Sequence, residues 1–243
     1  MNAELKVLGK FQWLINGDAA EELKKLPSNY IDLLVTDPPY KTTKRGSYSG
    51  TGGFFKKDEY NNGNGGLKHN NINPDEYLPD LYRIMKESAH GYLMCSDKTL
   101  IMFSNAIEKA GFKIIRNLVW VKNNCITGTF YMSNHEYIIF FRKGKGVKIN
   151  NCGTKTVLHF DNPRPKIHPN QKPVDLLKIL IENSSKKGDK VIDPFFGSGS
   201  TLVACKLLGR GFVGIEIDEY DYKLTQERVD SISFTKSQLD KQS

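Results

Sequence analysis

The sequence predicts an α/β fold built on a mostly parallel sheet, and three stretches of the chain carry this prediction. Residues 11–36 follow the order strand, helix, strand, which is the unit that joins neighbouring parallel strands. Residues 31–36 form an apolar, partly β-branched run that stops at Asp37-Pro38-Pro39, as a buried strand does. Residues 190–217 continue the pattern with a strand, a glycine-rich turn, a helix and a second strand.

Composition sets limits on the class of protein. The 243 residues suffice for one large α/β domain, with 39% hydrophobic and 26% charged residues, as in ordinary globular proteins. A net charge of +8 suits a polyanionic partner, although ordinary basic enzymes also carry such an excess. No run reaches the length of a membrane span and the first residues do not start a signal peptide, so we expect a cytoplasmic protein. The cysteines and histidines are scattered, which predicts no metal site.

The first half of the chain places acidic residues after two strands. Residues 11–18 read as a strand ending at Asp18, residues 19–26 as a helix, and Asp37 follows the next strand. We therefore expect Asp18 and Asp37 at the same edge of the sheet, where open α/β sheets bind ligands. Residues 41–74 then lose all periodicity and carry several lysines, which favours a mobile lid over the site rather than an idle insertion.

The middle of the chain alternates helices and strands before a basic segment. Patterns of period 3.6 predict helices over 75–86 and 98–109, and apolar runs predict strands over 91–96, 113–121 and 136–141. The last two strands should pair antiparallel, because their connection is too short for a helix. Residues 142–172 hold eight lysines and arginines against the single acid Asp161. This segment fits either a solvated surface or a nucleic-acid backbone.

The last third of the chain predicts a helix over 173–183 and then a nucleotide site. Gly197 and Gly199 allow the backbone to approach a ligand, and Glu216 follows Gly197 by 19 residues, near the spacing of a carboxylate that binds ribose hydroxyls. Alone, such a turn is more often a tight strand-to-helix connection. Leu202 stands at the third glycine position of dinucleotide-binding loops, so a nucleoside without a diphosphate fits better.

Three motifs together resemble a known family. They are Asp37-Pro38-Pro39-Tyr40, the segment 168–173 (His-Pro-Asn-Gln-Lys-Pro) and the segment 193–201 (Asp-Pro-Phe-Phe-Gly-Ser-Gly-Ser-Thr). They resemble the signatures of S-adenosylmethionine-dependent DNA amino-methyltransferases, and their order is similar to the β group, in which the catalytic motif precedes the cofactor motif. The resemblance spans roughly residues 11–229. Asn170 and Ser200 stand where the family usually has Thr.

The resemblance implies a fold and a set of roles. The fold would be a Rossmann-like methyltransferase domain over residues 1–243, with a seven-stranded, mostly parallel sheet, one antiparallel strand and helices on both faces. Residues 123–167 would form a small target-recognition segment. The catalytic residues would be Asp37, Pro38, Pro39 and Tyr40. The residues around S-adenosyl-L-methionine would be Asp18, Lys172, Asp193, Phe195, Gly197, Gly199, Ser200, Thr201 and Glu216.

The chemistry follows from the first motif. The exocyclic amino nitrogen of adenine is a poor nucleophile, because its lone pair is delocalised into the ring. Asp37 and the carbonyl of Pro38 can accept its two hydrogens from a rigid loop, and Tyr40 can stack on a base rotated out of the duplex. No cysteine lies in a nucleophile motif, which argues against methylation at cytosine C5.

Several alternatives stay open beside this prediction of an N6-adenine methyltransferase acting on double-stranded DNA. N4-cytosine enzymes usually show Ser in place of Asp37, so we favour adenine. An RNA or protein amino-methyltransferase usually has its motifs in the reverse order. A nicotinamide-dependent oxidoreductase lacks support from the glycine pattern, and a DNA-binding protein without catalysis conflicts with the intact Asp37 and Gly197. A homodimer and a cognate restriction endonuclease are further expectations.

Overall fold

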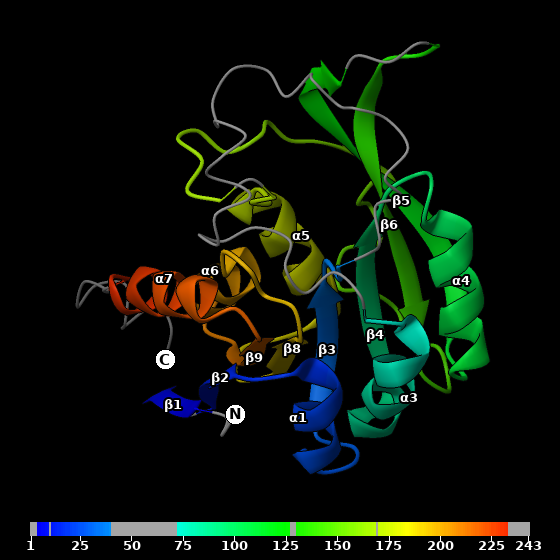
Figure 1. Cartoon of the computed structure of the whole chain (residues 1–243). Coiled ribbons are helices and arrows are strands. Elements are labelled where there is room, and N and C mark those ends of the chain that lie inside the picture. Colours follow the sequence, from blue (N-terminus) through cyan, green and yellow to red (C-terminus); the bar gives the residue numbers. More distant parts are fainter. Residues whose placement is uncertain (1–3, 10, 40–71, 127–129, 169, 233–243) are drawn as a thin grey trace.

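A nine-stranded sheet forms the centre of the protein (Figure 1). The computed structural model describes residues 4–9, 11–39, 72–126, 130–168 and 170–232. Along the sheet the strand order is β1-β2-β9-β8-β3-β4-β6-β5-β7. The strands are β1 (Glu4–Gly9), β2 (Gln12–Asn16), β3 (Ile31–Thr36), β4 (Met85–Cys95), β5 (Lys113–Ile126), β6 (Ser133–Arg142), β7 (Val157–His159), β8 (Lys190–Asp193) and β9 (Gly211–Glu216).

The strand directions confirm the predicted fold class. The stretch of the sheet from β2 to β5 contains seven strands. Six of them run parallel to one another, and β6 alone runs antiparallel to its neighbours β4 and β5. The expected antiparallel pairing of the 113–121 and 136–141 strands is therefore confirmed, although both strands are longer than expected. The Rossmann-like arrangement with one antiparallel strand matches the expectation.

The seven predicted strands are all present, and each edge of the sheet carries one more strand. At one edge β1 pairs antiparallel with β2, and at the other β7 pairs parallel with β5. β7 has only three residues and lies in the basic segment 142–172, for which no strand was predicted. Such a short strand has no periodicity of its own to detect, and its pairing with residues 119–121 is what defines it.

Six helices among the described residues cover the two faces of the sheet (Figure 1). One apolar cluster includes Leu23, Leu81 and Phe103, and the other includes Leu180, Ala204 and Val229. Helices α1, α3 and α4 therefore pack on one face, and α5, α6 and α7 on the other. The helices are α1 (Ala19–Lys25), α3 (Pro74–Ile84), α4 (Leu100–Lys109), α5 (Val174–Ser184), α6 (Ser200–Leu207) and α7 (Glu219–Asp230).

Helix α7 is the element that the sequence analysis missed. Its outward surface is charged, and its buried side includes the polar Thr225 beside Tyr222 and Val229, so its hydrophobic pattern is weak. By contrast, α3 begins with a capping box: the side chain of Asn73 accepts from the N–H of Asp75, and Oε1 of Glu76 accepts from the N–H of Asn73.

The parallel strands bring all the predicted acidic side chains together at the carboxyl ends of the strands. β2, β9, β8 and β3 are consecutive and parallel, so Asp18, Glu216, Asp193 and Asp37 all lie at or just beyond their carboxyl ends. The expected common edge for Asp18 and Asp37 is therefore confirmed. No helix in the described part of the chain is long and apolar enough to span a membrane.

Candidate active site

Two predicted motifs meet at the ends of β3 and β8. Oδ1 of Asp193 accepts a hydrogen bond from Oγ1 of Thr36 at 2.9 Å and another from the backbone N–H of Phe195 at 3.2 Å. Burial raises the pKa of Asp193 to about 6, with hydrogen bonds from Thr201 and Thr36 acting against the shift. Asp193 thus connects the glycine-rich loop to β3, the strand that directly precedes Asp37.

The glycine-rich loop needs glycine at two positions for different reasons. Gly199 has φ +71°, and a Cβ there would come within 2.3 Å of Cγ2 of Thr225. Gly197 has φ +47°, and a Cβ there would meet nothing within 4 Å. The backbone of Gly197 therefore borders open space, which a ligand can fill at close range.

Glu216 lies directly beside this open space. Its Oε2 accepts from the N–H of Gly197 at 2.9 Å, and its Oε1 accepts from the N–H of Asp218 at 3.0 Å. Burial raises the pKa of Glu216 to about 7, although both backbone hydrogen bonds favour the charged form. A buried carboxylate at the end of β9 can accept hydroxyl hydrogen bonds from a ribose.

Helix α7 holds the same loop from behind, which the sequence analysis did not anticipate. Oγ1 of Thr225 donates to the carbonyl of Gly197 at 2.7 Å. Nη1 of Arg228 donates to the carbonyl of Ser198 at 2.6 Å and to Oγ of Ser200 at 3.2 Å. These bonds fix the carbonyl groups of the loop away from the ligand side, so its conformation is set before a ligand binds.

Three of the other predicted cofactor residues already have partners within the protein. Asp18 is exposed and caps α1, and its Oδ1 accepts from the N–H groups of Ala20 and Glu21 at 2.8 and 3.3 Å. Ser200 and Thr201 are buried at the start of α6. Because both bonds of Asp18 use Oδ1, its Oδ2 stays available to a donor such as the amino group of an adenine.

Four charged side chains of alternating sign extend from the catalytic motif. Nζ of Lys172 donates to Oδ2 of Asp37 and lies 3.5 Å from Oε2 of Glu136. Oε1 of Glu136 in turn accepts from Nζ of Lys122. We call this set the charge ladder (Asp37, Lys172, Glu136, Lys122). Lys172, predicted to lie around the cofactor, thus contacts Asp37 in this structure.

The pKa values of the two acids in the ladder are shifted in opposite directions. Burial raises the pKa of Asp37, and the negative charge of Glu136 adds to this, whereas Lys172 acts against it. Burial also disfavours the charged form of Glu136, but Lys172 and Lys122 outweigh it and lower the pKa of Glu136 below its usual value. Glu136 and Lys122 were not predicted, because each lies on a strand and neither belongs to a motif.

The backbone after Asp37 is described as far as Pro39. Pro38 is buried and Pro39 is half-buried, so the carbonyl of Pro38 lies on a stiff, packed segment. Tyr40, together with residues 41–71 of the predicted lid, lies outside the described residues. Their predicted roles remain predictions.

The His-Pro-Asn-Gln-Lys-Pro segment contacts both α7, which lies behind the glycine-rich loop, and Asp37. The N–H of Asn170 donates to Nδ1 of His168 at 3.2 Å, so the proton of a neutral His168 is on Nε2, which lies 3.4 Å from Oδ2 of Asp221 on α7. The side chain of Gln171 accepts from the N–H of Ile167 at 2.9 Å. One short segment therefore contacts the helix behind the glycine-rich loop and carries Lys172 to Asp37.

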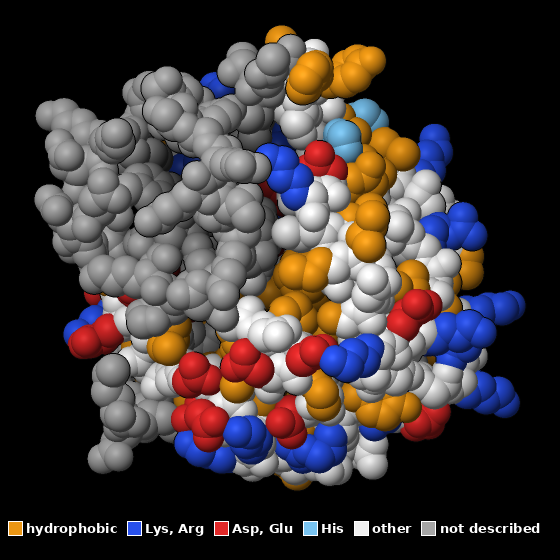
Figure 2. All heavy atoms as spheres, turned by 45° about the vertical axis from the view of Figure 1, so that its right-hand side comes forward, with side chains coloured by type: hydrophobic (Ala, Val, Ile, Leu, Met, Phe, Trp, Pro, Cys, Tyr) orange, Lys and Arg blue, Asp and Glu red, His pale blue; other side chains and the backbone are white. Residues whose placement is uncertain are grey.

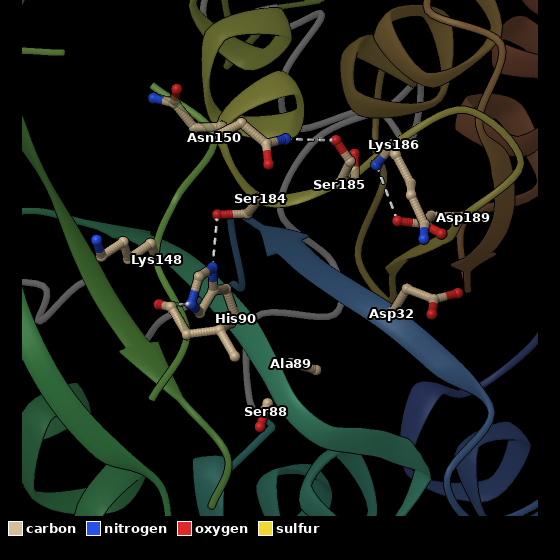
Figure 3. Close-up of a pocket in the computed structure, with 12 residues that line it drawn as sticks. Asp32, Ser88, Ala89, His90, Lys148, Asn150, Ser184, Ser185, Lys186 and Asp189 are labelled. Carbon is tan, nitrogen blue, oxygen red and sulfur yellow. Dashed lines mark hydrogen bonds between the residues drawn. The ribbon is translucent and has the colours of Figure 1, made fainter. Parts of the chain in front are cut away.

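A hollow lies at the other end of the strands from Asp37, near the amino end of β3 (Figure 3). Nδ1 of His90 lies 2.8 Å from Oγ of Ser184, which also bonds the hydroxyl of Tyr92 at 2.8 Å. Nε2 of His90 lies 3.2 Å from the carbonyl of Val147. These groups satisfy one another, and burial lowers the pKa of His90, so the cluster fastens neighbouring elements together.

The described residues fit a nucleoside methyl donor. Gly197 borders open space, the carboxylate of Glu216 lies beside it, and the N-terminus of α6 has no side-chain cap to occupy its N–H groups. Among the residues that the structure describes, no group of three or more His, Cys, Asp or Glu side chains could hold a metal ion.

Comparison with known proteins agrees with this geometry. The family model described as DNA methylase matches residues 31–227. The chain is 30% identical over 246 residues to the Type II methyltransferase M.HpaI of Haemophilus parainfluenzae, covering 90% of this chain and 74% of that one. It superposes on the M1.HpyAVI–SAM complex with a TM-score of 0.67 and 25% identity, covering 89% and 98% of the two chains.

The fold is also shared with a cytosine-specific enzyme. The PvuII DNA methyltransferase, described as cytosine-N4-specific, superposes with a TM-score of 0.69 at 14% identity, covering 95% of this chain and 90% of that one. The shared fold therefore does not distinguish adenine from cytosine as the target. The family match and the M.HpaI relationship show that this chain belongs to the N6/N4 DNA methylase family, whose methyl donor is S-adenosyl-L-methionine.

Proposed function

We propose that this DNA methyltransferase transfers its methyl group to the N6 amino group of an adenine rotated out of double-stranded DNA. The observation that carries the choice of base is Asp37, a carboxylate at the end of β3. Lys172 binds its Oδ2, which leaves Oδ1 to accept a hydrogen from the amino group. The carbonyl of Pro38 would accept the second hydrogen.

Two fixed acceptors solve the main chemical problem. With both amino hydrogens held, the nitrogen becomes pyramidal and its lone pair points out of the ring plane. When bound, S-adenosyl-L-methionine would supply an electrophilic methyl group; the new N–C bond would form as the S–CH3 bond breaks, and S-adenosylhomocysteine would leave as a neutral thioether. The methylated nitrogen is then strongly acidic, and Asp37 can take its proton and release it to solvent. The rigid proline backbone keeps reorganisation small while charge develops.

The charge ladder keeps Asp37 suited to this role. Lys172 favours the ionised form that accepts hydrogen bonds, and Glu136 prevents the two lysines from making Asp37 too weak a base. Catalysis by a cysteine nucleophile has no such support. Burial, together with Asp37 and Glu136, raises the pKa of Cys95, a thiol close to the ladder, to about 12.

The cofactor side of the site is assigned in the same way. Gly197 and Gly199 would form the wall beside the donor, Glu216 would hold the ribose hydroxyls, and Oδ2 of Asp18 would accept from the adenine of the donor. Asp193 and Phe195 would shape the loop. Ser200 and Thr201 at the start of α6 are proposed for the carboxylate end of the donor. Tyr40 is proposed to stack on the target base.

Identification of the product tests the proposal. Unmethylated genomic DNA is incubated with the protein and S-adenosylmethionine carrying a labelled methyl group, digested to nucleosides and separated. The expected result is label in N6-methyladenine at one short recurring sequence. Label in N4-methylcytosine would replace adenine by cytosine as the target. Label in neither would overturn the proposed function.

A further inference from the structure

The tip of the β5–β6 hairpin exposes three consecutive apolar side chains. Phe130 is 93% exposed, Tyr131 94% and Met132 59%, and the hairpin extends beyond the body of the sheet (Figure 1). Figure 2 shows hydrophobic side chains gathering at this extremity of the molecule. Two nearly fully exposed aromatic residues contribute nothing to the core, and adjacent exposed apolar residues of this size mark a contact surface.

Strand β5 is irregular near the base of the hairpin, where the segment around Asn162 contacts it. Val121 pairs with His135, whereas Ile126 pairs with Ser133, so residues 122–125 bulge from the ladder. The N–H of Asn162 donates to Oδ1 of Asn123 at 3.1 Å and its side chain bonds that of Asn124. Bulges that redirect a strand are common beside active sites. The bulged part of β5 below the tip is therefore held by a segment outside the hairpin.

The hairpin that carries this tip also carries part of the active site. Lys122 and Glu136, two members of the charge ladder, lie on β5 and β6 near the base of the protruding part. Tyr131 is five residues beyond Glu136, which is roughly 17 Å along an extended chain. This length is enough for the tip to reach a duplex whose target base has rotated out of the helix toward Asp37.

The segment that contacts the base of the hairpin has the charge that suits DNA. The segment that holds the bulge continues into Arg164 and Lys166, and Asp161 is the single acid between residues 142 and 172. A cationic flank matches phosphates, and flat aromatic side chains match the faces of bases. A protein partner would need an apolar groove but would gain nothing from the neighbouring cations.

We propose that Phe130, Tyr131 and Met132 insert among the bases of the DNA duplex beside the adenine that is methylated. Apolar side chains used in this way unstack a base step and make it easier for a neighbouring base to leave the helix. This inference rests on the proposed function, since it names the DNA contact of the same active site. It adds residues that lie outside the three motifs quoted from the sequence.

The test compares a tip variant with a matched control. The protein with both Phe130→Ala and Tyr131→Ala is measured against Val147→Ala, an exposed apolar residue (54%) beside the hollow at the other end of the strands. Binding of a labelled duplex containing the mapped target is followed by fluorescence anisotropy in the presence of S-adenosylhomocysteine. A duplex with 2-aminopurine at the target adenine reports rotation of that base by its fluorescence.

The double variant should bind the duplex roughly 5- to 150-fold more weakly, the range for loss of base–aromatic contacts, and should give a smaller 2-aminopurine signal. Its affinity for S-adenosylmethionine and its salt dependence should match wild type, whereas Arg164→Ala should reduce the salt slope by about one. Tyr131→Trp should retain binding.

Two outcomes would overturn the proposal. One is a double variant with unchanged DNA affinity and unchanged kcat/KM while the wild-type protein methylates DNA. The other is a wild-type dimer that the double variant converts to monomers without loss of DNA binding, because the tip would then contact a second copy of the chain. Failure of the wild-type protein to methylate DNA would instead contradict the proposed function.

Discussion

The two halves of the proposed active site are built from different kinds of groups. The cofactor half, around β8, β9, α6 and α7, uses backbone conformation: Gly197 and Gly199 have positive φ, and Thr225 and Arg228 hold the loop carbonyls. The catalytic half, around β3, β5 and β6, uses the alternating charges of the ladder. We therefore expect substitutions in the cofactor half to change binding of the methyl donor, and substitutions in the catalytic half to change the chemical step.

The largest expected effect comes from breaking the cofactor half. In Gly199→Ala the new Cβ would lie 2.3 Å from Thr225 and the backbone would be strained at φ +71°. S-adenosylmethionine should bind at least about 100-fold more weakly by calorimetry, and methyl transfer should be lost with it. Gly188→Ala is the control, because φ is +82° there but nothing lies within 4 Å of the added Cβ. Equal loss in both variants would assign the effect to backbone strain alone.

A smaller effect, with a sign, comes from changing the ladder. Lys172→Met removes the cation that lowers the pKa of Asp37, so the acid limb of the pH–kcat profile should move to higher pH, with roughly 10- to 100-fold lower activity at pH 7. Glu136→Gln removes an anion that raises the same pKa, so the limb should move to lower pH. Shifts of both limbs in the same direction would show that Asp37 does not govern the profile.

The ionisation of Glu216 gives the cofactor half a pH dependence of its own. Because the pKa of Glu216 is raised to about 7, its carboxylate is progressively lost as the pH falls below 7, and affinity for S-adenosylmethionine should fall with it. The dissociation constant should rise by at most about tenfold per pH unit. Calorimetric titrations at several pH values measure this, and Glu216→Gln should bind weakly with little pH dependence between pH 6 and 8. A persistent pH dependence in that variant would assign it to another group.

The smallest effect is expected behind the loop. Arg228→Ala leaves the carbonyl of Ser198 without its donor at 2.6 Å, so the loop loses support but keeps its glycines. We expect about 3- to 10-fold weaker binding of S-adenosylmethionine, the size of one hydrogen bond. Lys223→Ala, which changes an exposed cation on the same helix, is the matched control. An unchanged dissociation constant in Arg228→Ala would show that α7 does not position the loop.

Sequence reasoning found the parts of the site that follow local rules. Positions such as Pro38 and Gly199 are special because of their own backbone requirements, and the motifs that contain them are continuous. It missed Lys122 and Glu136, which lie on the neighbouring antiparallel strands β5 and β6; Glu136 meets Lys172 only after the sheet has formed. Lys172 and Asp37 are 135 residues apart in the chain. Such a contact depends on strand order and not on spacing.

The same distinction explains which elements of the fold were not predicted. The seven central strands follow apolar runs that the sequence displays, whereas β7 exists through its pairing with β5. Helix α7 has its polar Thr225 fully buried, where a hydrophobic pattern would show an apolar residue. That residue is polar because its hydroxyl holds the carbonyl of Gly197, so the position that weakens the pattern is one that serves the site.

Separate measurement of binding and chemistry in Asp37→Ala tests the central comparison most directly. Lys172 retains Glu136 at 3.5 Å, so its charge is not left without a partner when Asp37 is removed. On one preparation, calorimetry gives the dissociation constant of S-adenosylmethionine and transfer of a labelled methyl group to DNA gives the rate. The account predicts a dissociation constant within about twofold of wild type and a rate reduced by roughly 10²- to 10⁴-fold or more. Equal loss of binding and transfer would show that Asp37 supports the fold of the site rather than the reaction.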